Sequence, residues 1–419
     1  MQNTRILISG ASVAGPSAAY WLTHFGFDVT VVERAPALRE GGFAVDFRGT
    51  PHLTVLDRMG ILDQVRSMQT HMRGLAFVDT EGNTEFTLPA SFLSGDVEIE
   101  RADLSRIIYE RTRDAVEYRF DDSIASLTDT GDQVQVVFES GLERTFDLVI
   151  GADGLHSNVR RLVFGHESQF LKYGDYYVAG GFDVPNHLGL DHLANHYGVP
   201  GRSVSLSSHH RADVVTPVFV WHSPTPPQYD RKDIETQKRL ISEVFAGVGW
   251  EVPRVLDAMR DADHLYFDSL SQIKMETVSR GRVTLLGDAG YGATMGGLGT
   301  GLAVVSAYVL AGELARADGD HRLAFARYEE TIRDYARGCQ KVADGAGPFL
   351  APRTRRGMWL RDFAHRLLVR RPLATWLEKM TVKAAANIQL EDYATPDLAS
   401  DYTPSAGSTP PQRRIASSG

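Results

Sequence analysis

A glycine-rich turn followed by an acidic side chain stands near the start of the chain, with the spacing of a dinucleotide-binding fingerprint. The segment GASVAG at residues 10–15 follows an apolar run, and Glu33 ends a second apolar run about 20 residues further on. In this fingerprint Gly10 allows a tight turn, Gly15 lets a helix pack close to a strand, and amides at the helix start bind a pyrophosphate. Glu33 is placed to accept hydrogen bonds from a ribose diol. Ser12 replaces the middle glycine, and its small side chain still lets the backbone approach a phosphate.

Charged side chains also stand at three later junctions between an apolar run and a helical segment. Arg101 lies where a cation can reach an anionic ligand, or where it can form a surface salt bridge. Asp153 follows the apolar run 145–150 in the passage GADGLHSNVR. Asp288 follows the run 282–286 and precedes a glycine-dense loop. An acid at a strand end beside a helix N-terminus suits a polyol or a diphosphate that is held by side-chain and backbone groups together.

Hydrophobic periodicity and turn residues predict the elements that must position these side chains. Residues 5–9 and 28–32 are expected to be parallel strands, 74–89 a β-hairpin, and 170–222 a separate antiparallel sheet. We expect the strand 266–274 to return to the first domain. The predicted helices are 51–68, 231–247, 252–259, 302–315, 321–343 and one or two basic amphipathic helices within 359–390.

These elements predict an α/β chain with two interleaved domains and a C-terminal extension. The expected parts are a dinucleotide-binding domain (1–73, 98–168 and 270–345), a substrate domain (74–97 and 169–269), C-terminal helices (346–395) and a disordered tail (396–419). The tail is expected to be disordered because it is rich in serine, proline and alanine.

Composition excludes several classes of protein. A net charge of −9 argues against a general affinity for nucleic acid or acidic membranes, and the single cysteine, Cys339, excludes an intramolecular disulfide. The pairs His192/His196 and His209/His210 lack the acidic or cysteine partners of a metal site, so no metal is predicted. The chain has neither a basic and apolar leader nor an apolar run long enough to span a membrane, so we expect a cytosolic protein.

Three passages together resemble a known family: GASVAG with its acid, GADGLHSNVR, and GDAGY followed by the glycine loop. Their order and spacing are similar to those of the FAD-dependent aromatic hydroxylases, the para-hydroxybenzoate hydroxylase family of class A flavoprotein monooxygenases. Within that family the chain most resembles the tetracycline-inactivating flavin monooxygenases and their actinobacterial relatives. The resemblance covers about residues 4–340. It implies a Rossmann-type FAD-binding domain, an interleaved antiparallel-sheet substrate domain and a C-terminal helix that braces the two.

The resemblance also implies which residues bind the cofactor. These are Gly10, Ser12, Val13, Ala14, Gly15, Glu33, Arg34, Arg39, Asp46, Arg101, Asp153, Asp288, Gly299, Gly301 and Leu302. Glu33 would hold the adenosine ribose, Asp46 would lie near the flavin ring, and Arg101 would lie along the cofactor. Asp288 would bind ribityl or diphosphate oxygens, and Asp153 is associated in the family with both FAD and the nicotinamide cofactor.

The function that the resemblance implies is an FAD-dependent monooxygenase. NADPH or NADH would reduce FAD as a transient visitor, O2 would add at flavin C4a, and the peroxide would transfer one oxygen atom to a polycyclic or polyketide-like, tetracycline-like small molecule. No general base is strictly required, so no catalytic residue is named. In the absence of a coiled coil we expect a monomer or weak dimer.

The chain departs from the family's pattern beside the expected reactive edge of the flavin. Relatives generally have prolines in the loop after Tyr291, where this chain has Ala293, Thr294 and Met295. Many relatives also have an asparagine where this chain reads Leu-Ala at 302–303. These departures leave open a non-redox cyclase of the [4+2] type with structural FAD. A protein that only binds FAD and a hydrophobic ligand is a third alternative.

Overall fold

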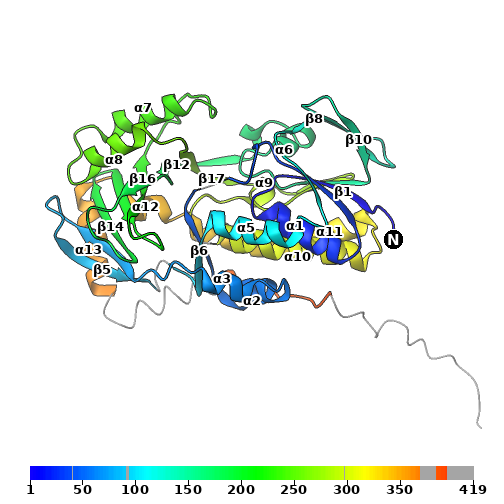
Figure 1. Cartoon of the computed structure of the whole chain (residues 1–419), viewed down its shortest axis with the longest axis horizontal. Helices are drawn as coiled ribbons and strands as arrows, with labels where there is room; N and C mark the ends of the chain where they lie inside the picture. The colour runs from blue at the N-terminus through cyan, green and yellow to red at the C-terminus, as the bar shows by residue number, and fades with distance from the viewer. Residues whose placement is uncertain (40, 91–93, 297, 369–383, 394–419) are drawn as a thin grey trace, which may run out of the picture.

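The computed structural model describes residues 1–39, 41–90, 94–296, 298–368 and 384–393. Figure 1 shows two sheet-centred parts side by side, with α1, α5, α10 and α11 in one and α7 and α8 covering the other. Among the described residues, no helix has both the length and the apolar character needed to cross a membrane.

The first part is built on a six-stranded sheet with the order β18-β19-β11-β1-β2-β7. Its strands are β18 (Ser279–Arg280), β19 (Val283–Leu285), β11 (Leu148–Gly151), β1 (Arg5–Ser9), β2 (Asp28–Val32) and β7 (Glu117–Arg119). All neighbouring pairs are parallel except β18 with β19. The helix α1 (Ala14–His24) connects β1 to β2, so the predicted βαβ unit is confirmed.

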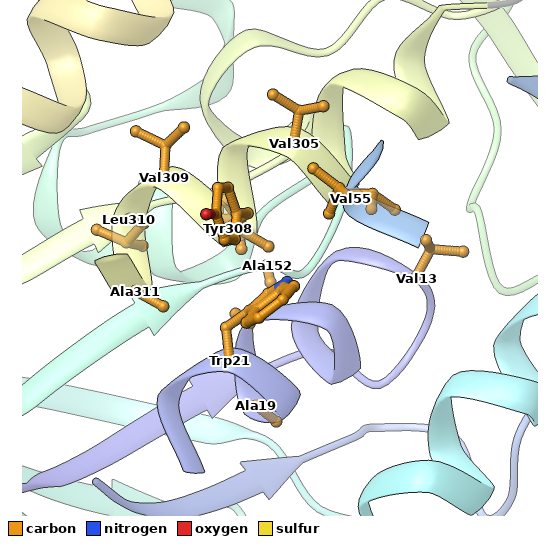
Figure 2. Close-up of a cluster of buried hydrophobic side chains, with 14 of the residues drawn as sticks. Val13, Ala19, Trp21, Val55, Ala152, Val305, Tyr308, Val309, Leu310 and Ala311 are labelled. Atoms are coloured by element: carbon orange, nitrogen blue, oxygen red, sulfur yellow. The ribbon is translucent and has the colours of Figure 1, made fainter. Parts of the chain in front are cut away.

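Helices pack around this sheet and against one another, and their apolar sides share buried cores with it. They are α2 (Gly49–Arg58), α3 (Leu62–Ser67), α5 (Arg101–Thr112), α6 (Asn158–Val163), α9 (Asp288–Tyr291), α10 (Gly299–Arg316) and α11 (His321–Ala343). Helix α10 is buried along almost its whole length, as its apolar sequence predicts. Trp21 of α1 meets Tyr308 of α10 edge to face, with ring centroids 4.7 Å apart (Figure 2). This contact packs the later part of α1 against the middle of α10.

The prediction of one helix over 51–68 was wrong, because the chain breaks between α2 and α3. Gly60 adopts a φ of +67° between the two helices, a conformation that favours glycine and ends a helix. The apolar positions Leu56, Met59 and Leu62 are nevertheless buried, so the periodicity identified the inward face correctly.

The second part is an eight-stranded sheet with the order β17-β12-β16-β15-β14-β4-β5, to which β13 adds beside β16. Its strands are β4 (Gly74–Val78), β5 (Thr84–Pro89), β12 (Leu171–Gly180), β13 (Val184–Pro185), β14 (Leu193–Val199), β15 (Arg202–Ser207), β16 (Val214–His222) and β17 (Tyr266–Ile273). The hairpin prediction for 74–89 is confirmed, and the sheet is antiparallel except where β14 runs parallel to β4. Helices α7 (Ile234–Phe245) and α8 (Val252–Arg260) cover it.

The strand predicted at 266–274 is present, but it pairs with β12 in the second sheet. Smaller sheets complete the fold: β8 (Ile124–Asp129), β9 (Val134–Phe138) and β10 (Glu143–Phe146) form one, and β3 (Ala44–Phe47) pairs with β6 (Val97–Glu100) in a ribbon. A short 3-10 helix, η1 (Glu167–Gln169), precedes β12.

The C-terminal segment contacts both parts, but through different residues. Helix α12 (Ala346–Leu350) lies against β12 and β16, and α13 (Arg355–Leu368) follows it. Further along, the hydroxyl of Tyr393 donates to the carboxylate of Glu313 in α10 at 2.7 Å. The prediction for the tail 396–419 lies outside the described residues.

Candidate functional site

A cavity of about 610 Å³ lies where the first part, the β3–β6 ribbon and the second sheet meet. Seven of the predicted cofactor residues line it: Ser12, Val13, Ala14, Asp46, Arg101, Asp288 and Gly299. The other eight lie outside its lining: Gly10, Gly15, Glu33, Arg34, Arg39, Asp153, Gly301 and Leu302. The seven lining residues come from five separate stretches of the sequence, which therefore converge on one space.

The turn between β1 and α1 is held open toward the cavity by its two glycines. Gly10 has a φ of +108°, and a Cβ at Gly15 would lie 1.9 Å from the Gly10 carbonyl oxygen. Larger residues at either position would push α1 away from the turn. Helix α1 begins without a side-chain cap and without an acid in its first turn, so its free amides can receive an anion.

Glu33 acts on this turn from outside the cavity. One of its carboxylate oxygens accepts a hydrogen bond from the Ala11 N–H at 2.8 Å, and the other accepts from the Ala35 N–H at 2.9 Å. The acid of the fingerprint thus fixes the backbone of the glycine turn. Arg34 and Arg39 are exposed nearby.

Arg101 and Asp288 place opposite charges on the cavity wall. The guanidinium of Arg101, the first residue of α5, donates to the Ser12 hydroxyl at 2.9 Å. Asp288 begins α9, and among the described residues its carboxylate has no hydrogen-bond partner, although it is open to the cavity. Surrounding protein raises the pKa of Asp288 by desolvation, the charge of Arg101 opposes that shift, and Asp268 adds to it. A ligand hydroxyl would give Asp288 the partner that it lacks.

Helix α10 presents its N-terminus to the same space. Gly299 and Thr300 line the cavity, and this helix also begins without a side-chain cap. Gly301 lies behind them, where a Cβ would come within 2.1 Å of the His52 ring. Leu302 is buried in the core. Two uncapped helix starts and one arginine therefore surround the cavity, a donor set that suits a diphosphate.

Asp153 is engaged by its own turn. Its carboxylate accepts hydrogen bonds from the Ser157 hydroxyl and from the backbone N–H groups of Asn158 at 2.8 Å and Val159 at 3.1 Å. It thereby caps α6, while the neighbouring residues Gly154 and Leu155 line the cavity.

The β3–β6 ribbon adds charged groups that the sequence reasoning largely missed. Asp46 and Arg48 form a buried ion pair, and Glu98 lies directly opposite Asp46 in the register. Burial raises the pKa of Asp46 to about 6, with the Arg48 charge opposing the shift and Glu98 adding to it. Both Arg48 and Glu98 line the cavity. Strand alternation was the sequence signal that could have revealed Arg48. Residues two apart in an extended segment share a face, and Arg48 stands two residues after Asp46.

The remaining wall is apolar and comes mainly from the second sheet and the C-terminal segment. The rings of Phe43 and Tyr266 meet at 64° with centroids 5.1 Å apart, and Val218, Met295 and Phe349 complete this side. Apart from Met295, noted for its departure from the family pattern, these residues carried no chemical signal in the sequence. Tertiary packing alone brings them together.

The loop that departs from the family pattern is fastened to the second sheet. The Thr294 N–H donates to the Ser271 carbonyl oxygen at 3.1 Å, and Ala293 forms a β-bridge with Gln272. Met295 has a φ of +57°, an uncommon conformation for a residue with a side chain. The altered residues therefore form a defined wall of the cavity.

Comparison with known proteins gives this geometry a family. Residues 3–343 match the model of the FAD binding domain family. The chain is 44% identical to an uncharacterised protein of Mycobacterium tuberculosis, and the match covers 83% of this chain and 94% of that protein. It is 41% identical to a flavin-dependent monooxygenase from an unknown prokaryotic organism, over 80% of this chain and 87% of that protein.

A solved structure agrees with the sequence relatives. Tetracycline destructase Tet(55) superposes with a TM-score of 0.80 at 36% identity, covering 94% of this chain and 100% of the other. The chain therefore belongs to the FAD binding domain family and is an FAD-dependent monooxygenase of the aromatic hydroxylase type. The resemblance that the three sequence passages indicated is confirmed, and so is FAD as the cofactor.

Proposed function

We propose that the enzyme oxygenates a polycyclic, polyketide-like small molecule in the 610 Å³ cavity, with NADPH or NADH as reductant and O2 as oxidant. The observation that carries this proposal is the division of one cavity into a polar, anion-binding half and an apolar, aromatic half. Bound FAD supplies the activation of oxygen, and the protein orients the substrate and keeps water away from the reaction. The likeness to the tetracycline destructases Tet(55) and Tet(51) supports the same class of substrate.

In this proposal the polar half holds FAD. The amides at the starts of α1 and α10, together with Arg101, would neutralise the diphosphate. Asp288 would accept hydrogen bonds from ribityl hydroxyls. Each carboxylate oxygen of Glu33 accepts one backbone hydrogen bond and keeps a second lone pair, so Glu33 would still reach a ribose diol.

The other predicted cofactor residues keep supporting roles in the proposal. Gly10, Gly15, Gly301 and Leu302 would act through backbone shape and packing. Asp153 would act by holding the turn that carries Gly154 and Leu155, and Arg34 and Arg39 would border the adenosine end from the surface.

The apolar half would hold the substrate. Phe43, Tyr266 and Phe349 offer aromatic faces to a flat ring system, and the Asp46–Arg48 pair with Glu98 offers hydrogen-bonding groups at one end. This division assigns 1–73, 98–168 and 270–345 to the FAD-binding domain and 74–97 with 169–269 to the substrate domain. Because β17 continues the second sheet to Ile273, we propose to move the last of these boundaries from residue 269 to residue 273.

Anaerobic reduction of the purified protein by NADPH or NADH tests the proposal. Flavin absorbance is followed with and without tetracyclines and polycyclic phenols, and oxygen is then admitted. The expected result is bleaching that one class of ligand accelerates, followed by a product heavier by one oxygen atom. A flavin that stays oxidised with every ligand, while the cavity still binds them, would favour the cyclase alternative.

A further inference from the structure

An apolar patch on helix α13 is exposed beside the cavity-lining segment. Trp359, Leu360 and Phe363 are 66%, 60% and 53% exposed, and the rings of Trp359 and Phe363 stack with centroids 5.4 Å apart. The other large hydrophobic side chains exposed among the described residues, Met1, Leu142 and Leu323, lie on separate elements. Single exposed hydrophobic residues are common on protein surfaces, whereas a cluster of them marks an interaction site. We therefore expect the exposed side of α13 to bind a partner.

Arginines are frequent in the sequence around this patch, although the whole chain is acidic. Residues 353–371 contain seven arginines and one acid, against a net charge of −9 for the protein. Arg355 and Arg356 are exposed in the first turn of α13, and among the described residues neither forms an ion pair. Cations are unfavourable at a helix N-terminus, so these two arginines do not serve the stability of α13. The one acid, Asp362, is paired with Arg361 at 2.9 Å.

The opposite side of α13 is attached to the protein. The Arg361 guanidinium stacks 4.8 Å from the centre of the Phe77 ring in β4 and donates to the carbonyl oxygens of Phe349 and Leu350 at 3.3 Å. Phe349 and Leu350 also line the cavity. The helix therefore presents tryptophan, leucine and phenylalanine outward from a fixed base next to the cavity wall.

We propose that α13 docks the enzyme on an anionic lipid surface, with its apolar side chains in the boundary between headgroups and acyl chains. A short helix with aromatic and leucine side chains on one face and two exposed arginines in its first turn has the character of an interfacial helix. The arginines supply attraction to anionic headgroups that the acidic remainder of the chain cannot supply. The net charge of the whole chain predicted no general affinity for acidic membranes. The proposal rests instead on the local positive charge near α13. Docking would bring the cavity wall to a surface in which apolar molecules dissolve.

Vesicle co-sedimentation of the full-length, FAD-loaded protein tests this proposal. Phosphatidylcholine vesicles with and without phosphatidylglycerol are compared at low and high salt. Binding is expected only with phosphatidylglycerol and should fall as salt screens the charges. The triple variant Trp359→Ser/Leu360→Ser/Phe363→Ser and the variant Arg355→Glu/Arg356→Glu should each bind about ten-fold more weakly. Flavin absorbance and circular dichroism check that each variant is folded.

Matched controls make the result specific to α13. The variant Leu142→Ser/Leu323→Ser removes exposed hydrophobic side chains elsewhere and should bind like the wild type. Vesicles should shift the tryptophan emission to the blue in the wild type, and Trp359→Phe should lose that shift. Equal binding by the triple variant, or no binding by the wild type, would overturn the proposal. So would a wild-type dimer in size-exclusion chromatography that the triple variant converts to a monomer, because the patch would then join two copies.

Discussion

The Nε2 atom of His52 lies 2.6 Å from the hydroxyl oxygen of Tyr335, which joins α2 to α11 in the fully buried core beside the cavity. The Nδ1 atom of His52 accepts a hydrogen bond from the Arg48 N–H at 3.0 Å, so the proton of the neutral ring lies on Nε2 and is donated to Tyr335. Burial, together with the nearby charge of Arg48, lowers the pKa of His52 to about 3. A neutral histidine thus supports the strand end that carries Arg48.

Replacing His52 by phenylalanine should destabilise the protein by about 1–3 kcal/mol, because the Arg48 N–H and the Tyr335 hydroxyl lose their buried partner. Chemical denaturation measures this change. Adding Tyr335→Phe should cost less in the His52→Phe background than in the wild type, since the hydrogen bond between the two side chains is already lost there. Strictly additive effects would contradict the coupling.

Replacing Asp288 by alanine should weaken FAD binding about 10- to 100-fold without lowering the stability of the FAD-free protein. The reason is that its carboxylate has no protein hydrogen-bond partner among the described residues. Equilibrium titration of FAD against the apoprotein measures the effect. Asp114→Ala, at a side chain that is 94% exposed, serves as the control and should leave the affinity unchanged.

Glu33→Ala should behave differently from Asp288→Ala, because Glu33 holds the glycine turn as well as facing the proposed ribose position. Loss of the bonds to Ala11 and Ala35 should lower the free energy of unfolding of the apoprotein by about 1–3 kcal/mol. FAD affinity should fall in parallel. An apoprotein of unchanged stability would show that the two backbone hydrogen bonds contribute little.

His156 should make stability depend on pH. Burial opposes its charge, but hydrogen bonds to Asp268 and Glu167 outweigh burial and raise its pKa. Because the folded pKa exceeds the unfolded value of about 6.5, the stabilisation is complete below that pH. It is lost as pH rises through the folded pKa.

The free energy of unfolding, measured across this pH range, should show the loss in the wild type and not in His156→Asn. The two proteins should differ by about 1–3 kcal/mol at low pH and converge at high pH. His71→Asn, which replaces an exposed histidine, should keep the wild-type profile. A constant difference between wild type and His156→Asn would mean that His156 acts only through packing.

Phe43→Ala should raise the KM for a polycyclic substrate about ten-fold, because it removes one aromatic face from the apolar half of the cavity. Steady-state oxidation of the substrate identified by the reduction assay measures it. Tyr266→Phe keeps the ring and should leave the KM near the wild-type value. FAD affinity should stay unchanged in both variants, which separates this effect from cofactor loss.

The sequence by itself determined the elements whose signals are local. The turn at Gly10 and the helix α1 follow from short-range rules of backbone conformation and packing, and the structure has both as predicted. The buried helix α10 was equally clear, since a long segment with almost no charge has no solvent-facing side. The same local reasoning overlooked the break at Gly60, because the apolar period continues across it.

Tertiary structure alone decided what these local elements enclose. Phe43, Tyr266 and Phe349 are far apart in the chain, and their residue types gave no sign of a shared role. They form one wall of the cavity only because the second sheet and α12 pack beside the β3–β6 ribbon. The same holds for α13, whose apolar residues the sequence marks as one face of a helix. That face is exposed because the opposite side of the helix, which carries Arg361, packs on the second sheet. This contact is long-range and cannot be deduced from the local sequence.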